Sequence, residues 1–275
     1  MGFGCNAVGV TGCRIIDSPR ERLLAVLTNV FVPCNGRFPA IIAVLTMFFA
    51  FGISWMPALL LTLVLVSGVA MTFCVTKFLS KTVLKGEASS FILELPPYRT
   101  PQVGKVIIRS LLDRTVFVLG RAVSVAAPAG LVIWLMANIY IGDISILTLC
   151  ADFLDPFARV LGVDGVILMA FILGFPANEI VIPIIIMVYT ASGTVTDISA
   201  LSEIKTLLIQ NGWTWTTAVS MIIFTLFHWP CSTTLITVKK ETGSIKWTLL
   251  AALLPTGVGI ICCTVFTSVC RMFGV

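Results

Sequence analysis

Charged residues are scarce in this sequence. Only 11% of its 275 residues are Asp, Glu, Lys or Arg, whereas soluble domains carry about 25%. The mean hydropathy is +1.05, and several apolar runs approach or exceed the roughly 20 residues that cross a bilayer as a helix. Because these runs are continuous rather than alternating, we expect an all-α fold, a polytopic integral membrane helical bundle.

Other absences narrow the function. Histidine occurs once, as His228. The patterns GxxxxGK[ST], HExxH, CxxC and GxSxG are missing, so the sequence predicts no P-loop nucleotide site, zinc protease site, paired thiols or nucleophile elbow. The nine cysteines are odd in number and lie mostly in or beside apolar runs, which favours free thiols over a disulfide framework. The first residues lack the regions of a signal peptide.

Basic residues cluster between the apolar runs. The net charge is +5, and the basic stretch 77–121 is predicted to be a cytoplasmic loop. Within it, residues 102–121 are expected to form an amphipathic helix at the membrane interface. No basic stripe is interleaved with aromatics, so we predict no nucleic-acid partner. The acidic stretch 143–164 is expected to be an external loop. The expected spans, roughly six by length, are 39–54, 56–76, 122–141, 165–190, 214–238 and 246–272.

Three apolar segments are interrupted by proline together with polar residues. The interruptions are VPCNGRFP (32–39), GFPANEIVIP (174–183) and FHWPCSTT (227–234). Polar groups inside a membrane are costly, which makes them functional candidates. Broken helices also free backbone amides and carbonyls to line a path, as in many transporters. The three breaks are therefore the predicted functional region of a bundle with broken or re-entrant helices.

Two of the breaks place a cysteine beside a proline, at Cys34 and Cys231. A thiol suits a transition metal such as Fe²⁺, Cu⁺ or Zn²⁺, and Glu179 in the third break could add a carboxylate or relay a proton. The residues alone leave alternatives open. Buried cysteines commonly pack as small hydrophobes, Glu179 could pair with an arginine, and His228 is either a ligand or a hydrogen-bonded ring at an interface.

These segments, taken in order, resemble the C-terminal membrane part of the bacterial ferrous iron transport protein B family (FeoB). The resemblance covers nearly the whole chain, and its last two motifs are long and specific. The matching segments are GFGCNAVGV and CR within 2–14, RERLL (20–24), PCNGRFP (33–39), LELPPYRTP (93–101), GFPANEIVIPIIIMVY (174–189) and FHWPCSTTLITVKKETGSIKWTLLAALLPTGVG (227–259).

The resemblance implies ferrous iron uptake by a multi-pass protein of the bacterial inner membrane. Fe²⁺ would be the transported substrate, with no permanently bound cofactor and with membrane lipid around the helices. The implied metal path contains Cys34 and Cys231, to which Glu179 is added. The gate motifs carried over from the family are Gly4, Cys5 and Asn6 in the first gate, and Pro176, Ala177, Asn178 and Glu179 in the second.

The sequence also departs from the family. Val8 stands where the family usually has proline, and Gly12-Cys13-Arg14 stands for Ala-Thr-Arg. The family's GTPase domain is not found in this chain, so we expect no enzyme activity from it. We expect a fragment, a degenerate product, or one half of a split transporter that needs a GTPase-bearing N-terminal half or upstream subunit. A homo-oligomer is a further expectation.

The chain is expected to divide into three regions. Residues 1–76 would hold the first gate and two spanning helices, 77–121 the cytoplasmic loop, and 122–275 the second gate and the C-terminal spans. Two other functions stay open. The gate motifs could serve an organic solute such as a nucleoside, although the cysteine pair favours a metal. The chain could also be an inactive membrane scaffold or partner subunit. A thiol redox enzyme is disfavoured without CxxC.

Overall fold

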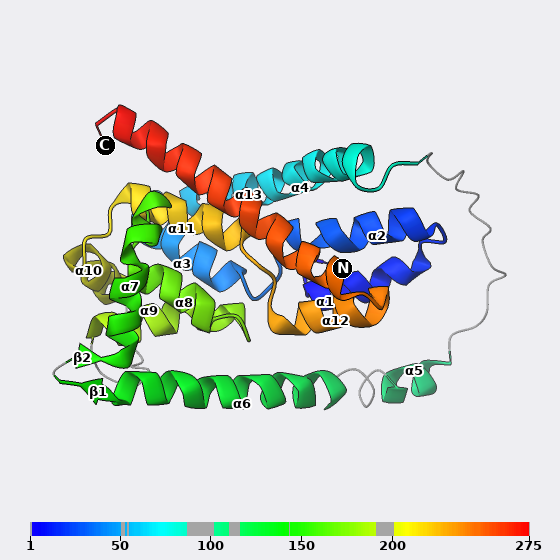
Figure 1. Cartoon of the computed structure of the whole chain (residues 1–275), viewed down its shortest axis with the longest axis horizontal. Coiled ribbons are helices and arrows are strands. Elements are labelled where there is room, and N and C mark those ends of the chain that lie inside the picture. Colours follow the sequence, from blue (N-terminus) through cyan, green and yellow to red (C-terminus); the bar gives the residue numbers. More distant parts are fainter. Residues whose placement is uncertain are drawn as a thin grey trace.

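The computed structural model describes residues 2–50, 53, 55–86, 102–109, 116–142, 144–190 and 201–274. These residues form helices joined by short breaks, with one two-stranded hairpin in which β1 (Tyr140–Ile141) pairs antiparallel with β2 (Ile144–Ser145) (Figure 1). The predicted all-α helical bundle is confirmed.

The helices follow one another along the chain with few residues between them. They are α1 (Asn6–Gly12), η1 (Cys13–Ile15), α2 (Pro19–Thr28), η2 (Asn29–Phe31), α3 (Phe38–Phe49), α4 (Met56–Thr82), α5 (Val103–Arg109), α6 (Phe117–Asn138), α7 (Ile146–Val160), α8 (Gly165–Leu173), η4 (Asn178–Ile180), α9 (Val181–Thr190), α10 (Leu201–Gln210), α11 (Trp215–Phe227), α12 (Ser232–Thr242) and α13 (Ile245–Met272).

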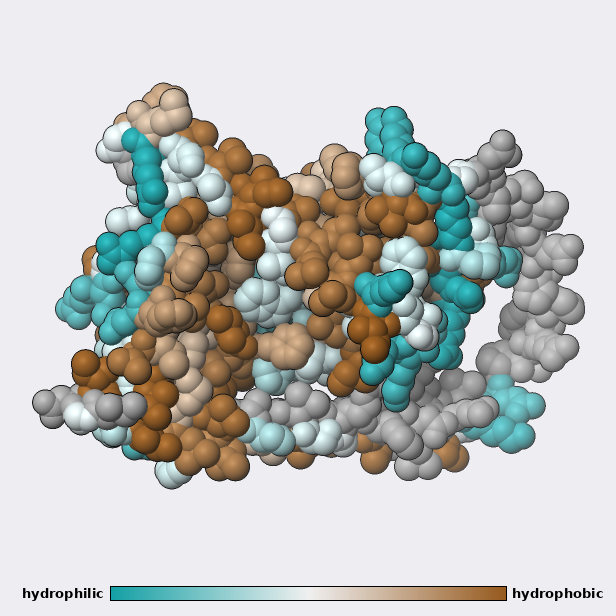
Figure 2. Space-filling view, viewed as in Figure 1, coloured by the Kyte–Doolittle hydropathy of each residue, from teal (hydrophilic) through white to brown (hydrophobic). Residues whose placement is uncertain are grey.

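Two long helices lie on the outside of the bundle. The most apolar 18-residue windows of α4 and α13 are only 17% and 22% buried, whereas that of the segment Trp215–Thr242, formed by α11 and α12, is 67% buried. Exposed apolar side chains such as Leu63, Phe73, Ile261 and Val265 cover α4 and α13, and Figure 2 shows the apolar surface that runs along α13. These outer faces suit contact with lipid, while α11 forms the centre.

Fewer than the six expected crossings can be identified by length and composition among the residues that the structure describes. Three segments are long and apolar enough to cross a membrane, or four if α7 and α8 count as one span bent by 108°. The expected span 39–54 appears as α3, whose 12 residues extend about 18 Å. The expected span 165–190 is divided into α8 and α9 by the predicted break.

Two further predictions of local structure differ from what the structure shows. The acidic stretch 143–164, expected to be a loop, is mostly the amphipathic helix α7, which begins at the Ser145 cap and buries Leu147, Ala151 and Ala158. The interfacial helix expected at 102–121 appears as α5 over Val103–Arg109. Residues 110–115 lie outside the described residues, and α6 begins at Phe117.

The helix ends follow signals that can be read in the sequence. Ser18 caps α2 by accepting a hydrogen bond from the Glu21 amide, with Pro19 in the first turn. The Asp164 carboxylate caps α8 through the Ile167 amide at 2.7 Å. Gly243 ends α12 with φ of +63°, a conformation that costs glycine little.

Glycine lets both outer helices approach the centre. A Cβ atom on Gly68 of α4 would lie 2.9 Å from the Phe31 carbonyl oxygen, and one on Gly259 of α13 would lie 3.0 Å from the Phe227 carbonyl oxygen. Small residues serve the same purpose in many membrane helix pairs. The outer helices therefore pack directly against η2 and against the end of α11, where the chain breaks.

Candidate functional site

The three predicted breaks meet near the middle of the molecule (Figure 1). The Ser232 amide, in the third break, donates to the Phe175 carbonyl in the second break at 2.9 Å. Asn178 Oδ1 lies 3.3 Å from His228 Nε2, which joins the same two segments a second time. The first break joins the third through Arg37, so segments nearly 200 residues apart line one region.

Arg37 is the residue that holds the breaks together. Its side chain is fully buried. One terminal nitrogen donates to the carbonyls of Val30 at 3.1 Å and Leu226 at 2.9 Å. The other donates to the carbonyls of His228 at 3.0 Å and Trp229 at 3.3 Å. Carbonyls at the end of a helix lack intrahelical partners, and the planar guanidinium satisfies several of them at the end of α11.

The two predicted path cysteines lie beside this arginine. Cys34 is buried, with 8% of its surface exposed, and its carbonyl accepts the Arg37 amide at 2.9 Å. Cys231 is partly exposed, and its sulfur lies 3.3 Å from the Thr234 hydroxyl. Cys34 is three residues before Arg37, and Cys231 is two residues after Trp229, whose carbonyl accepts from Arg37. The structure thus brings the segments that carry Cys34 and Cys231 to the same buried charge.

Arg37 belongs to the predicted break VPCNGRFP, but the sequence pattern assigns it no role. A signal was present, because a lone basic residue between Gly36 and Phe38 in an apolar segment needs partners inside the fold. What the pattern could not identify was the partners. They are backbone carbonyls of η2 and of the third break, which a pattern of side chains does not reveal.

His228 has protein partners on both ring nitrogens. It is buried, and its Nδ1 lies 3.1 Å from the Phe224 carbonyl oxygen and 2.9 Å from that of Thr225. Carbonyls only accept, so Nδ1 carries the hydrogen, and the Nε2 of a neutral ring then accepts. A hydrogen bond from Asn178 to Nε2 therefore requires the amide NH₂ of Asn178 to face the ring. Exchanging the O and N atoms of this amide gives that orientation. In this arrangement His228 joins α11 to the second gate.

Glu179 reaches the first break from the second gate. A Cβ atom on Gly36 would lie 3.3 Å from Glu179 Oε1, so the carboxylate lies over the glycine that precedes Arg37. Glu179 is exposed, and Pro176 and Ala177 before it are partly buried. The second gate thus presents an accessible carboxylate over the glycine that precedes the buried arginine.

The first gate motif also contacts the first break. The Asn35 amide donates to the Gly4 carbonyl at 3.3 Å. Asn6 is buried, with 3% exposed, and with its amide O and N exchanged it donates to the carbonyls of Gly2 and Val32, each at 3.2 Å. Cys5 is the partly exposed cap residue of α1. The motif Gly4-Cys5-Asn6 therefore supports the loop that carries Cys34.

Val8, where the family usually has proline, lies in the first turn of α1. Helix α1 begins at Asn6 and continues through Val8 to Gly12, and the Val8 side chain is 45% exposed. Val8 is the third residue of α1, in the first turn, where proline is also tolerated because the first amides of a helix have no intrahelical partner. In this chain the first gate motif is followed by a regular helical turn.

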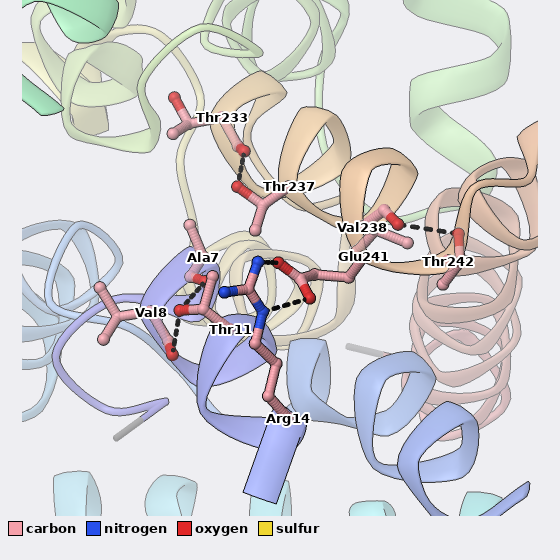
Figure 3. A network of polar contacts seen from close by, with 9 residues as sticks. All are labelled: Ala7, Val8, Thr11, Arg14, Thr233, Thr237, Val238, Glu241 and Thr242. Atoms are coloured by element: carbon pink, nitrogen blue, oxygen red, sulfur yellow. Dashed lines mark hydrogen bonds and ion pairs between the residues drawn. The ribbon is translucent and has the colours of Figure 1, made fainter. Parts of the chain in front are cut away.

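The short helix η1, which directly follows α1, is tied to α12 by an ion pair. The Arg14 guanidinium donates to Glu241 through Nε at 2.7 Å and through Nη2 at 2.6 Å, and Figure 3 shows the two side chains facing each other between the helices. The Glu241 side chain is 13% exposed and that of Arg14 is 68% exposed. Burial, and after it the Glu241 charge, raises the pKa of the neighbouring Cys13 thiol.

Reversing this ion pair should weaken the contact between η1 and α12. We expect Arg14→Glu and Glu241→Arg each to lower the thermal unfolding midpoint in detergent, because each places like charges together. The double variant restores opposite charges and should recover most of the loss. Because Arg14 is exposed, the differences should shrink in high salt. A double variant no more stable than the single variants would contradict an energetic role for the pair.

Two polar atoms at the centre lack partners among the described residues. Arg37 Nε and Ser232 Oγ are buried without a hydrogen bond in that part of the chain. Such atoms are rare in folded proteins, and both belong to residues next to the thiols or to the third break. Within the described ranges, no three His, Cys, Asp or Glu side chains group as a metal-binding cluster.

Two family models match the chain. A model of the ferrous iron transport protein B C terminus matches residues 61–113, and a gate model described as nucleoside recognition matches residues 119–245. The second match contains the GFPANEIVIP and FHWPCSTT breaks. No solved structure matches the chain.

Curated relatives extend the similarity to nearly the whole chain. A Staphylococcus aureus (strain MSSA476) protein named Fe(2+) transporter FeoB is 29% identical over 99% of this chain and 40% of its own length. Proteins of the same name are 25% identical over 89% of this chain in Leptospira interrogans, and 24% identical over 91% in Methanocaldococcus jannaschii. These relatives are matched over 38% and 37% of their lengths.

The chain therefore spans about two fifths of the length of the curated relatives that it matches. The predicted resemblance is confirmed, since the matches fall on the membrane segments and the gate motifs. Together with the long apolar helices, they identify a multi-pass membrane protein.

Proposed function

Since this chain is similar, over nearly its whole length, to the C-terminal membrane part of the ferrous iron transport protein B family, we propose that it is the permease portion of a Fe²⁺ transporter. The proposal extends to a bacterial inner-membrane location. The relatives are named Fe²⁺ transporters as whole proteins, and this chain corresponds to part of them.

One observation carries the proposal: the three breaks meet, with Cys34 and Cys231 in the two breaks that a single buried arginine joins. Soft thiol ligands suit a late first-row metal such as Fe²⁺ better than they suit Mg²⁺ or Ca²⁺. The ligands come from separate broken segments, so the site can change when these segments move. This is the arrangement of midplane sites in many transporters.

The exposure of the candidate ligands suggests an order along the path. Glu179 is exposed, Cys231 is partly exposed and Cys34 is buried. A hydrated cation would meet the carboxylate first and exchange water for the softer sulfur ligands deeper in. Gly36 leaves room for Glu179 above the first break.

Arg37 affects the cation as well as the fold. A fixed guanidinium repels Fe²⁺ by charge, so anionic ligands are needed to hold the ion near it. The same repulsion keeps the binding weak. Conduction requires a site that is favourable enough to enter and weak enough to leave. Arg37 is thus proposed to position the breaks and to prevent Fe²⁺ from being trapped.

The proposed transporter has partners that the chain itself does not supply. The relatives are more than twice as long as the matched part, and we propose that uptake needs the family's GTPase-bearing portion. In this proposal the chain conducts Fe²⁺ and hydrolyses no nucleotide. Its outer helices α4 and α13 would face lipid or a second copy of the chain.

The organic-solute alternative is not favoured. The gate model's description concerns nucleosides, but relatives covering the same residues are named Fe²⁺ transporters. The residue types of the breaks also fit a metal better than a nucleoside, because the breaks contribute two thiols and a carboxylate. The scaffold alternative is separated from transport by the experiment below.

Fe²⁺ uptake in a bacterial host deficient in iron uptake tests the proposal. The host would express this chain alone, and then together with a GTPase-bearing portion of a family member. We expect radiolabelled Fe²⁺ uptake only in the second case. Membrane insertion is checked by fractionation. No Fe²⁺ uptake in either case, with the protein inserted, would contradict the proposal, and nucleoside uptake in the same cells would support the alternative.

A further inference from the structure

A second polar site lies away from the three breaks, where α7, α8, α11 and α13 meet (left side of Figure 1). It is a cavity of about 300 Å³ lined by, among others, Asp155, Asp164, Ser220 and Thr267. These residues come from the bend between α7 and α8, from the first half of α11, and from the end of α13. None of them belongs to the metal path proposed above.

Two hydroxyls in this cavity have no partner among the described residues. Ser220 Oγ and Thr267 Oγ1 are buried without a hydrogen bond, and their residues are 1% and 8% exposed. A buried hydroxyl without a partner is costly, and most serine and threonine side chains in helices donate to a carbonyl one turn earlier. These two lack any such bond.

Gly162 makes room for both hydroxyls. A Cβ atom there would lie 2.3 Å from Thr267 Oγ1 and 2.6 Å from Ser220 Oγ, so the two oxygens point at the same side of the glycine. The φ of Gly162 is +76°, which L side chains rarely adopt. The space between α7 and α8 is thus kept free of side chains at the point that the hydroxyls face.

Four charged side chains line the cavity, namely Asp155, Asp164, Arg159 and Arg271. Asp155 is paired with Arg159, and its other oxygen accepts the Gly165 amide at 3.1 Å. The exposed Arg271 donates to the Arg159 carbonyl at 2.7 Å. Asp164 accepts from the Ile167 amide and the Tyr189 hydroxyl, which are both neutral donors. Among the residues that the structure describes, no ion pair neutralises Asp164.

We propose that this cavity binds an alkali-metal cation, Na⁺ or K⁺. The available groups are hard oxygens, carboxylate and hydroxyl, which suit such ions rather than a soft metal. The Asp164 carboxylate has no ion-pair partner among the described residues and would bind the cation directly, whereas the exposed Arg271 donates to the Arg159 carbonyl. A bound cation would satisfy both hydroxyls and connect the α7–α8 bend to α11, whose other end opens into the third break.

Thermal unfolding of the purified chain in detergent tests this site without any transport assay. Unfolding midpoints are compared in NaCl, KCl and choline chloride at equal ionic strength. We expect Na⁺ or K⁺ to raise the midpoint by about 3–5 °C for each tenfold increase beyond half-saturation. Choline is too large to be held by these oxygens. Equal midpoints in all three salts would overturn the proposal and indicate a cavity that holds water only.

Substitutions that remove the two hydroxyls test whether the cation binds in this cavity. Ser220→Ala and Thr267→Val remove oxygens that make no bond to the described protein, so their midpoints in choline should match or exceed that of the wild type. Their response to Na⁺ or K⁺ should be lost, or weakened about tenfold. The control is Thr256→Val in α13, whose hydroxyl donates to the Ala252 carbonyl. An unchanged cation response in both variants would also overturn the proposal.

Discussion

Replacing Arg37 with methionine is expected to destabilise the protein strongly and to abolish Fe²⁺ uptake. The substitution keeps a long apolar side chain but leaves the carbonyls of Val30, Leu226, His228 and Trp229 without their donor. Each buried acceptor left unpaired costs about 1–3 kcal/mol. Some of these carbonyls will find water or relax, so we expect a total loss of roughly 3–5 kcal/mol.

The measurement is the unfolding midpoint in detergent, together with uptake in cells that contain the GTPase-bearing portion. Arg37→Lys is informative because it keeps the charge but not the planar fork, and an ammonium group does not reach four carbonyls in the same way. It should fall between the wild type and Arg37→Met. The matched control is Arg22→Met, since Arg22 is an exposed residue of α2. Equal losses at positions 37 and 22 would contradict the central role of Arg37.

Replacing Cys231 or Cys34 with serine is expected to reduce Fe²⁺ uptake while the protein stays folded. Serine keeps the approximate size of the side chain but replaces soft sulfur with a harder oxygen, which is a poorer ligand for Fe²⁺. Metal sites typically lose 10–100-fold in affinity or activity when even a supporting residue is removed. We therefore expect at least about a tenfold loss for either path cysteine.

Cys262→Ser is the matched control for this second prediction. Cys262 is also a partly exposed thiol of an apolar helix, but it belongs to α13 and to none of the three breaks. Its substitution should leave uptake nearly unchanged. Expression and membrane insertion of all three variants are compared by fractionation. Similar losses at Cys231 and Cys262 would show that loss of a thiol from an apolar segment, rather than loss of a ligand, explains the effect.

A substitution of Glu179 tests the proposed order of the ligands along the path in the same uptake assay. Because it is exposed and comes first in the proposed order, Glu179→Gln should raise the Fe²⁺ concentration needed for half-maximal uptake more than it lowers the maximal rate. The cysteine variants should lower the maximal rate, since they lie deeper. The opposite pattern would argue against the proposed order along the path.

Much of the architecture followed from the sequence alone. The shortage of charge and the continuous apolar runs predicted a helical membrane protein, because lipid leaves backbone groups no other partners. The proline-containing segments predicted all three breaks correctly, since proline stops helices through local geometry that needs no tertiary contact. The cap residues Ser18 and Gly243 likewise act within one turn of their own helix.

The sequence predictions failed where the length of a helix or its tertiary packing determined the structure. An apolar segment such as 39–54 reads as a span, but α3 ends at Phe49. The acidic stretch 143–164 reads as a loop because of its charge. It is helical because Leu147, Ala151 and Ala158 recur on one face and are buried. Hydrophobic periodicity in a short segment gains its stability from tertiary packing.

By itself, then, the sequence determined the class of protein, the positions of the breaks and the residue types within them, because each depends on local backbone chemistry or on composition. The tertiary structure alone decided that the breaks meet, that Arg37 joins them through backbone carbonyls, and that Ser220 and Thr267 face a common cavity beside Asp164. These are contacts between segments far apart in the chain. The partners of a buried arginine or hydroxyl are set by how helices pack in three dimensions, which a local pattern does not specify.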